Sequence, residues 1–204
     1  MPRGLSMVAL VPAMAAMLTA PTSAAAEVDA IEVDKELTYT CEFPYLVPQE
    51  LSGTVRVSLP DSVEVGERFQ ANSDVTIALT LNEDIVTVLN LLEAATFEGT
   101  ARADVDADIS GLRTTLGIPG LRIPVTEVPP EGELPVTITG TMPSLIAYQP
   151  GTLTLAAGEE FTATIDARRV DGSPIELGEF DVTCAITTTD PPQDPHLATI
   201  PITE

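Results

Sequence analysis

Few side chains in this sequence are suited to catalysis. The 204-residue chain has one histidine, His196, in a proline-rich stretch where a general base is hard to bury and orient. Its one lysine is Lys35, and no Gly-x-Ser-x-Gly nucleophile motif occurs. A pair of carboxylates could support glycoside hydrolysis, but with 31 acidic residues a close pair carries no specificity. The sequence therefore predicts no catalytic residue and no enzyme, with a glycosidase-like pair as the enzymatic alternative.

The acidic run Asp104, Asp106 and Asp108 matches the start of a calcium-binding loop. The same loop requires glycine at its sixth position and glutamate at its twelfth, where this chain has Ile109 and Thr115. In a strand the three carboxylates would lie on one face, about 7 Å apart. We expect a solvated outer face, no metal site and no cofactor, while adventitious Ca²⁺ binding by the acidic faces stays open.

The charge balance restricts the class of partner. Against 31 Asp and Glu the chain has 9 Lys and Arg, a net charge of −22. Nucleic acids and anionic membrane surfaces are bound through cationic side chains that replace counterions. We therefore expect neither as a partner.

The first 26 residues have the organisation of a secretory signal peptide. A positive start at Met1–Arg3 precedes the uncharged, apolar segment 4–20, and Ala24–Ala26 forms a small-residue cleavage site before Glu27. Cleavage after Ala26 would leave no membrane span in the mature chain, and an uncleaved anchor is the alternative. We expect the protein to be secreted or held at the cell envelope.

Two cysteines in an exported chain usually form a disulfide. Cys41 alternates in phase with Tyr39 and Phe43, and Cys184 with Val182. A Cys41–Cys184 bridge would close a loop of about 144 residues, for which chain entropy alone gives roughly 5 kcal/mol as an upper value. Metal binding by the two thiols is the weaker alternative, because two ligands do not complete a structural zinc site.

The elements that must position these residues are mostly strands. After residue 36, short runs of alternating apolar residues are separated by Pro, Gly, Asp and Ser, a rhythm typical of sandwiches and barrels. One inward row, at residues 101–107, consists mainly of alanine. Asn82 precedes two acids and a helical apolar spacing, which predicts one short helix over residues 83–95. The pattern favours an all-β, immunoglobulin-like β-sandwich with one short helix.

A weak internal repeat leaves the domain organisation open. Segments that begin at Gly53 and Gly140 share turn chemistry about 90 residues apart, near the size of an immunoglobulin unit. We expect an acidic lead-in at 27–34, a sandwich domain at 35–189, and a proline-rich tail at 190–204 with a possible last strand. Either the sandwich consists of two lobes split near residue 140, or the shared motifs are ordinary turns.

The ordered motifs together resemble an uncharacterised secreted β domain of actinobacteria, over about residues 35–202. The motifs are Tyr39–Pro44, Gly140–Leu145, Asp171–Pro174, Leu177–Phe180 followed by Cys184, and Gln193 with Leu197–Ile200. The resemblance implies an exported β domain with a Cys41–Cys184 bridge. It supplies no assigned activity and no catalytic residue.

These observations favour an exported, non-catalytic binding or structural domain at the cell envelope or outside the cell. Its edge strands and loops would contact an envelope protein or a glycan. The alternative is a secreted protease inhibitor or a ligand-carrier domain.

Overall fold

The computed structural model describes residues 30–204. The expected signal peptide, its cleavage site after Ala26, and residues 27–29 lie outside the described residues. The elements along the chain are β1 (Ala30–Glu42), β2 (Gln49–Pro60), β3 (Val63–Glu64), β4 (Arg68–Phe69), β5 (Val75–Leu81), α1 (Glu83–Leu91), β6 (Thr96–Ile109), β7 (Leu112–Glu127), β8 (Leu134–Gly140), β9 (Leu145–Ile146), β10 (Gly151–Arg168), β11 (Pro174–Ile186) and β12 (His196–Thr203).

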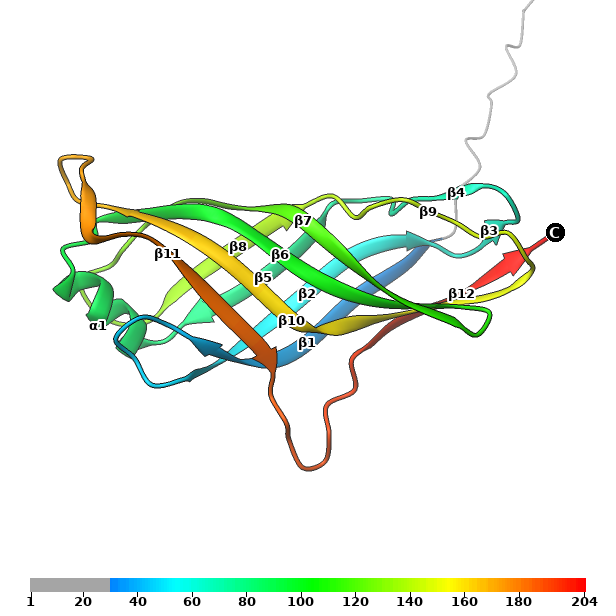
Figure 1. The fold of residues 1–204 in the computed structure, drawn as a ribbon, viewed down its shortest axis with the longest axis horizontal. Helices are drawn as coiled ribbons and strands as arrows, with labels where there is room; N and C mark the ends of the chain where they lie inside the picture. Colours follow the sequence, from blue (N-terminus) through cyan, green and yellow to red (C-terminus); the bar gives the residue numbers. More distant parts are fainter. Residues whose placement is uncertain (1–29) are drawn as a thin grey trace, which may run out of the picture.

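Eight strands form a closed barrel (Figure 1). The order β11-β1-β2-β5-β8-β7-β6-β10 returns to its start because β10 also pairs with β11. The predicted immunoglobulin-like sandwich is therefore wrong, although the all-β class with one short helix agrees. Apolar alternation has the same period in both architectures, since each buries one face of every strand. The sequence pattern could not separate them.

The option of two lobes is wrong for the same reason. Strands from both sides of residue 140 share one sheet, with β8 beside β5 and β10 beside β6. The two glycines of the apparent repeat also differ in position, since Gly53 lies within β2 whereas Gly140 ends β8. The shared motifs are ordinary turn and strand chemistry.

The alternation expected from the sequence places the apolar side chains inside the barrel. On β1, Val33, Leu37 and Cys41 are buried, whereas Asp34 and Glu36, between the first two, point outward. Outward positions along the strands carry most of the charged residues. The strand starts at Ala30, so residues 30–34, which we expected to be a lead-in, belong to the barrel wall.

Helix α1 covers one end of the barrel, at the left of Figure 1. Asn82 caps it by accepting a hydrogen bond from the Ile85 backbone N–H, and Ile85, Val86 and Leu89 bury its apolar face. The helix ends at Leu91, earlier than the sequence predicted. Glu93 adopts a left-handed conformation with φ of 61°, which turns the chain toward β6.

Strand β10 divides one of its edges between two partners. Residues 151–156 pair with β12, and residues 160–168 pair with β11. Between the end of β11 and the start of β12, residues 187–195 leave the wall as a loop that projects below the barrel in Figure 1. The stretch expected to be a tail therefore includes β12, a strand with six residues paired to β10.

Strand β1 has the complementary arrangement. Residues 39–42 pair with β11, but among the described residues no strand forms backbone pairs with this edge at positions 30–38. Strand β12 lies next to β1 there without a ladder. We call this boundary between residues 30–38 of β1 and β12 the seam.

Candidate functional site: an apolar cavity inside the barrel

The barrel encloses a cavity of about 140 Å³ at mid-height. Six side chains that face it are only partly buried, although their strands direct them inward: Val55, Ile77, Leu79, Phe161, Ile165 and Phe180. Inward residues nearer the ends, such as Leu59 and Leu155, are 1% exposed. The accessible surface of the six therefore faces the hollow.

Small side chains explain why the interior is not filled. An eight-stranded barrel is just wide enough for side chains to fill it. Strand β6, however, contributes Ala101, Ala103 and Ala107 to the inner face, and β2 contributes Gly53. The alanine row was visible in the sequence, and it was the signal for a hollow core.

Both ends of the cavity are closed by packed residues. On the helix side, Ile85 and Leu89 of α1 line it directly. Toward the opposite end, Leu155 and Ile200 are at most 1% exposed and fill the barrel. Packed residues therefore close the cavity at both ends of the barrel axis, and the strands of the barrel wall surround it on its sides.

The cysteines form the expected disulfide, and it lines this cavity. Cys41 on β1 lies directly opposite Cys184 on β11, with their Cα atoms 3.9 Å apart. Each sulfur is bonded to the other, so neither serves the metal-binding alternative. The bridge joins β1 to β11, which are neighbours in the barrel wall.

Tyr39 brings a hydroxyl group to the cavity wall. It follows the alternation inward, and its Oη donates a hydrogen bond to the Gly158 carbonyl oxygen over 3.1 Å. Gly158 lies in an irregular stretch of β10, where the three residues between Ala157 and Phe161 oppose a single residue of β6, Asp104. Burial raises the pKa of Tyr39 to about 12, so the phenol stays neutral at physiological pH.

Asp104 also borders the cavity, but the alternation along β6 places its side chain on the outer face of the wall, between the inward Ala103 and Val105. Its Oδ1 lies 3.1 Å from Arg102 Nη2, an ion-pair distance. The two groups are not aligned for a hydrogen bond, and this buried oxygen has no hydrogen-bond partner within residues 30–204. A buried acceptor without a partner is rare in folded proteins.

One glutamine side chain joins the loop to β1 at the start of the seam. Gln193 Oε1 accepts from the Thr38 backbone N–H over 2.8 Å, and its Nε2 donates to the carbonyls of Thr38 and Thr187 over 2.8 and 2.7 Å. The amide thus occupies the position of a strand residue beside β1. Nearby, Lys35 forms an ion pair of 2.9 Å with Asp194.

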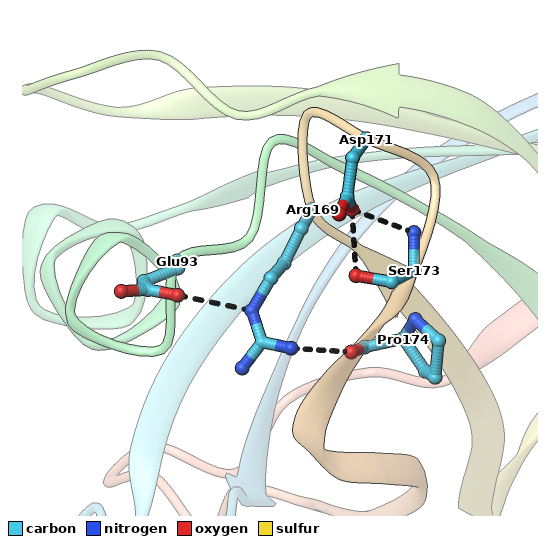
Figure 2. Close-up of polar contacts among 5 residues, drawn as sticks. All are labelled: Glu93, Arg169, Asp171, Ser173 and Pro174. Atoms are coloured by element: carbon cyan, nitrogen blue, oxygen red, sulfur yellow. Dashed lines mark hydrogen bonds and ion pairs between the residues drawn. The ribbon is translucent and has the colours of Figure 1, made fainter.

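The loop after β10 is fixed to the end of α1 by an arginine (Figure 2). Arg169 Nε donates to Glu93 over 3.0 Å, and Nη1 donates to the Pro174 carbonyl over 2.8 Å. Asp171 accepts hydrogen bonds from the Ser173 hydroxyl and from the Ser173 backbone N–H. Both bonds hold the pKa of Asp171 below its usual value, and the bond from the hydroxyl has the larger effect. These groups hold the turn against the helix.

The structure separates the residues that could have formed a catalytic or metal site. Asp106 accepts from Thr115, and Asp108 accepts from the Gly111 backbone and pairs with Arg113. The exposed His196 has a ring nitrogen 2.9 Å from the Thr199 hydroxyl. No three His, Cys, Asp or Glu side chains converge as a metal site within residues 30–204. No helix in the same part of the chain is both long and apolar enough to span a membrane.

Comparison with protein families gives a match that covers most of the barrel. A family of unknown function, DUF6801, matches residues 38–198. The chain belongs to this family. The DUF6801 match includes Cys41, Cys184, Tyr39, Gly158 and the loop with Gln193. No curated protein and no solved structure matches the chain.

The sequence identified the disulfide but not the other groups at the cavity. Tyr39 was in phase with Cys41, so its inward direction followed from the alternation. Its partner Gly158 lies 119 positions further along the chain, and Gln193 bonds Thr38 across 155 positions. No local signal indicates either pairing.

Proposed function

We propose that this protein is an exported, non-catalytic binding protein that holds a small apolar molecule inside its barrel. The observation that carries the proposal is the cavity, whose inward side chains are hydrocarbon apart from Tyr39 and the disulfide. Of the functions considered from the sequence, the ligand carrier is the one that an internal cavity supports.

The size and lining of the cavity favour a small apolar ligand. An apolar cavity of about 150 Å³ in another protein stays dry and takes up benzene. Eight-stranded barrels hold a single small ligand in the same position in the barrel. Transfer of an apolar molecule from water into such a space is favourable at about 25 cal/mol per Å² of buried surface.

The distribution of polar groups supports a role without catalysis. Lys35 and His196 have the most suitable chemistry for a base, but neither lines the cavity. Lys35 pairs with Asp194 of the loop, and the His196 ring contacts Thr199 of β12. A cavity with one neutral phenol offers no nucleophile activated by a base.

Export rests on the signal-peptide pattern and is supported by the disulfide, which persists in oxidising compartments. The mass of the secreted protein tests it, because cleavage after Ala26 predicts a chain that begins at Glu27. An intact residue 1 in the secreted fraction would contradict the cleavage. The actinobacterial source and an envelope protein or glycan as partner stay predictions from the resemblance.

Ligand binding is tested with a neutral fluorescent probe, N-phenyl-1-naphthylamine, titrated into the purified protein. Ala103→Leu places a larger side chain in the cavity, and we expect it to weaken probe binding at least tenfold. Ala185→Leu is the matched control, because Ala185 is exposed on the outer face of β11. This variant should bind the probe as the wild type does. Absence of binding, or equal binding by Ala103→Leu, would contradict the carrier function.

A further inference from the structure

The hydrogen-bonding groups at the cavity define which polar ligand atoms it can accept. Among the side chains that point into the cavity, Tyr39 is the polar one, and the others are hydrocarbon or the disulfide. A ligand that carries a polar group must pair it with Tyr39, because an unpaired polar group in an apolar interior is costly.

The Tyr39 hydroxyl can only accept a hydrogen bond from a ligand. A phenol has one donor, and that of Tyr39 is already given to the Gly158 carbonyl. The carbonyl is firmly placed, because Gly158 is buried and a Cβ there would come within 2.7 Å of the Asp104 backbone. The remaining lone pairs of Tyr39 Oη are therefore the part free to bind a ligand.

The Asp104 carboxylate does not provide a second polar group for a ligand. Its buried Oδ1 lies beside Arg102 on the outer face of β6, where no described residue donates a hydrogen bond to it. Arg102 is half-exposed and packs on Gly117 of the next strand, so it does not present a cation to the cavity. The polar group of the lining, the Tyr39 hydroxyl, thus calls for a donor, and it cannot neutralise an anion.

We propose that the ligand is an uncharged apolar molecule with a hydroxyl group, and that this hydroxyl donates to Tyr39 Oη. This inference rests on the carrier function and specifies its ligand class. A fatty-acid carboxylate is disfavoured, because it would be buried with no cation to pair with it, in a chain of net charge −22. An ether or ester of the same size brings only acceptors and gains no bond at Tyr39.

The test uses three probes with nearly the same apolar part. These are 1-octanol, its isomer 1-methoxyheptane, which has no donor, and octanoate, which is charged. Each competes against N-phenyl-1-naphthylamine on the wild-type protein. We expect 1-octanol to bind about 5- to 10-fold more tightly than the ether, as one buried hydrogen bond predicts, and octanoate to bind most weakly.

Tyr39→Phe removes the acceptor while keeping the ring. We expect it to reduce the affinity for 1-octanol to that for 1-methoxyheptane, with the ether affinity unchanged. The chain offers two matched controls, Tyr45→Phe and Tyr148→Phe, since these tyrosines are 76% and 77% exposed. Both should retain the preference for the alcohol.

Three outcomes would overturn the ligand class and leave the carrier function standing. They are equal binding of alcohol and ether, tightest binding of octanoate, and a preference for the alcohol that survives in Tyr39→Phe. Absence of binding by the fluorescent probe and by all three competitors would overturn the carrier function itself. The wild-type series decides the class even if Tyr39→Phe does not fold.

Discussion

The two halves of strand β1 are held in the barrel in different ways. Residues 39–41 have a backbone ladder on both edges and a disulfide from Cys41 to Cys184. Residues 30–38 have a ladder only with β2, and their other edge meets the seam. There Thr38 is bonded to Gln193 and to the Thr187 backbone N–H, and Lys35 pairs with Asp194. One half is closed covalently and the other by a few hydrogen bonds and an ion pair. Opening the wall beside the cavity therefore costs least along the seam.

The largest effect should come from removing the covalent closure. We expect Cys41→Ala/Cys184→Ala to lower the free energy of unfolding by about 3–5 kcal/mol, because the bridge restricts a long loop in the unfolded chain. Urea unfolding measures this, and the wild type in reductant should approach the double variant. An unchanged urea midpoint would show that the two halves of β1 do not differ in strength.

A glycine where β10 passes from β11 to β12 gives the next effect. Gly158→Ala should cost about 1–3 kcal/mol, because its Cβ would lie 2.7 Å from Asp104 backbone and Cβ atoms. Gly53→Ala is the matched control in β2, where the new Cβ finds ordinary contacts from 3.5 Å. That variant should gain about 0.5–1 kcal/mol, because alanine loses less backbone entropy on folding. Equal effects of the two variants in urea would contradict the packing described here.

The seam itself is tested at Gln193. Gln193→Ala removes three hydrogen bonds and should cost about 1–2 kcal/mol. The effect should be local, with faster hydrogen exchange at the Thr38 amide and little change at the amides of residues 41 and 42. Gln149→Ala, at an exposed position, serves as the control. Unchanged exchange at Thr38 would show that the glutamine does not hold the seam.

The smallest effect concerns the ion pair across the seam. The Lys35 ammonium, and then the His196 backbone N–H, hold the pKa of Asp194 below its ordinary value. A lowered pKa in the folded state adds stability above the unfolded pKa of about 4, and this is lost as the pH falls through the folded value. Lys35→Met should therefore differ slightly from the wild type at pH 7 and not at pH 2. A stability difference that persists at pH 2 or in high salt would contradict an electrostatic cause.

The local features of the fold could be predicted from the sequence, and its closure could not. Alternation along residues 37–43 gave the inward direction of Tyr39 and Cys41, and Asn82 gave the start of the helix. Whether strands close into a barrel depends on pairings such as β10 with β11, which no local pattern encodes. The alanine row on β6 indicated space inside the barrel. The hydrogen bond of the Tyr39 hydroxyl, however, depends on an irregular stretch of β10 that brings the Gly158 carbonyl to it.

The disulfide also determines how far the chain can be stretched. Cys41 and Cys184 are 143 positions apart, and the covalent ring between them contains β2 through β10. If force acted on Ala30 and Glu204, only the two arms outside the ring could unravel. These arms comprise roughly 30 residues, on the order of 100 Å when extended at about 3.4 Å per residue. Reduction of the bridge would release the ring and increase this extension about sixfold. The maximum extension of the chain thus depends on the redox state around it.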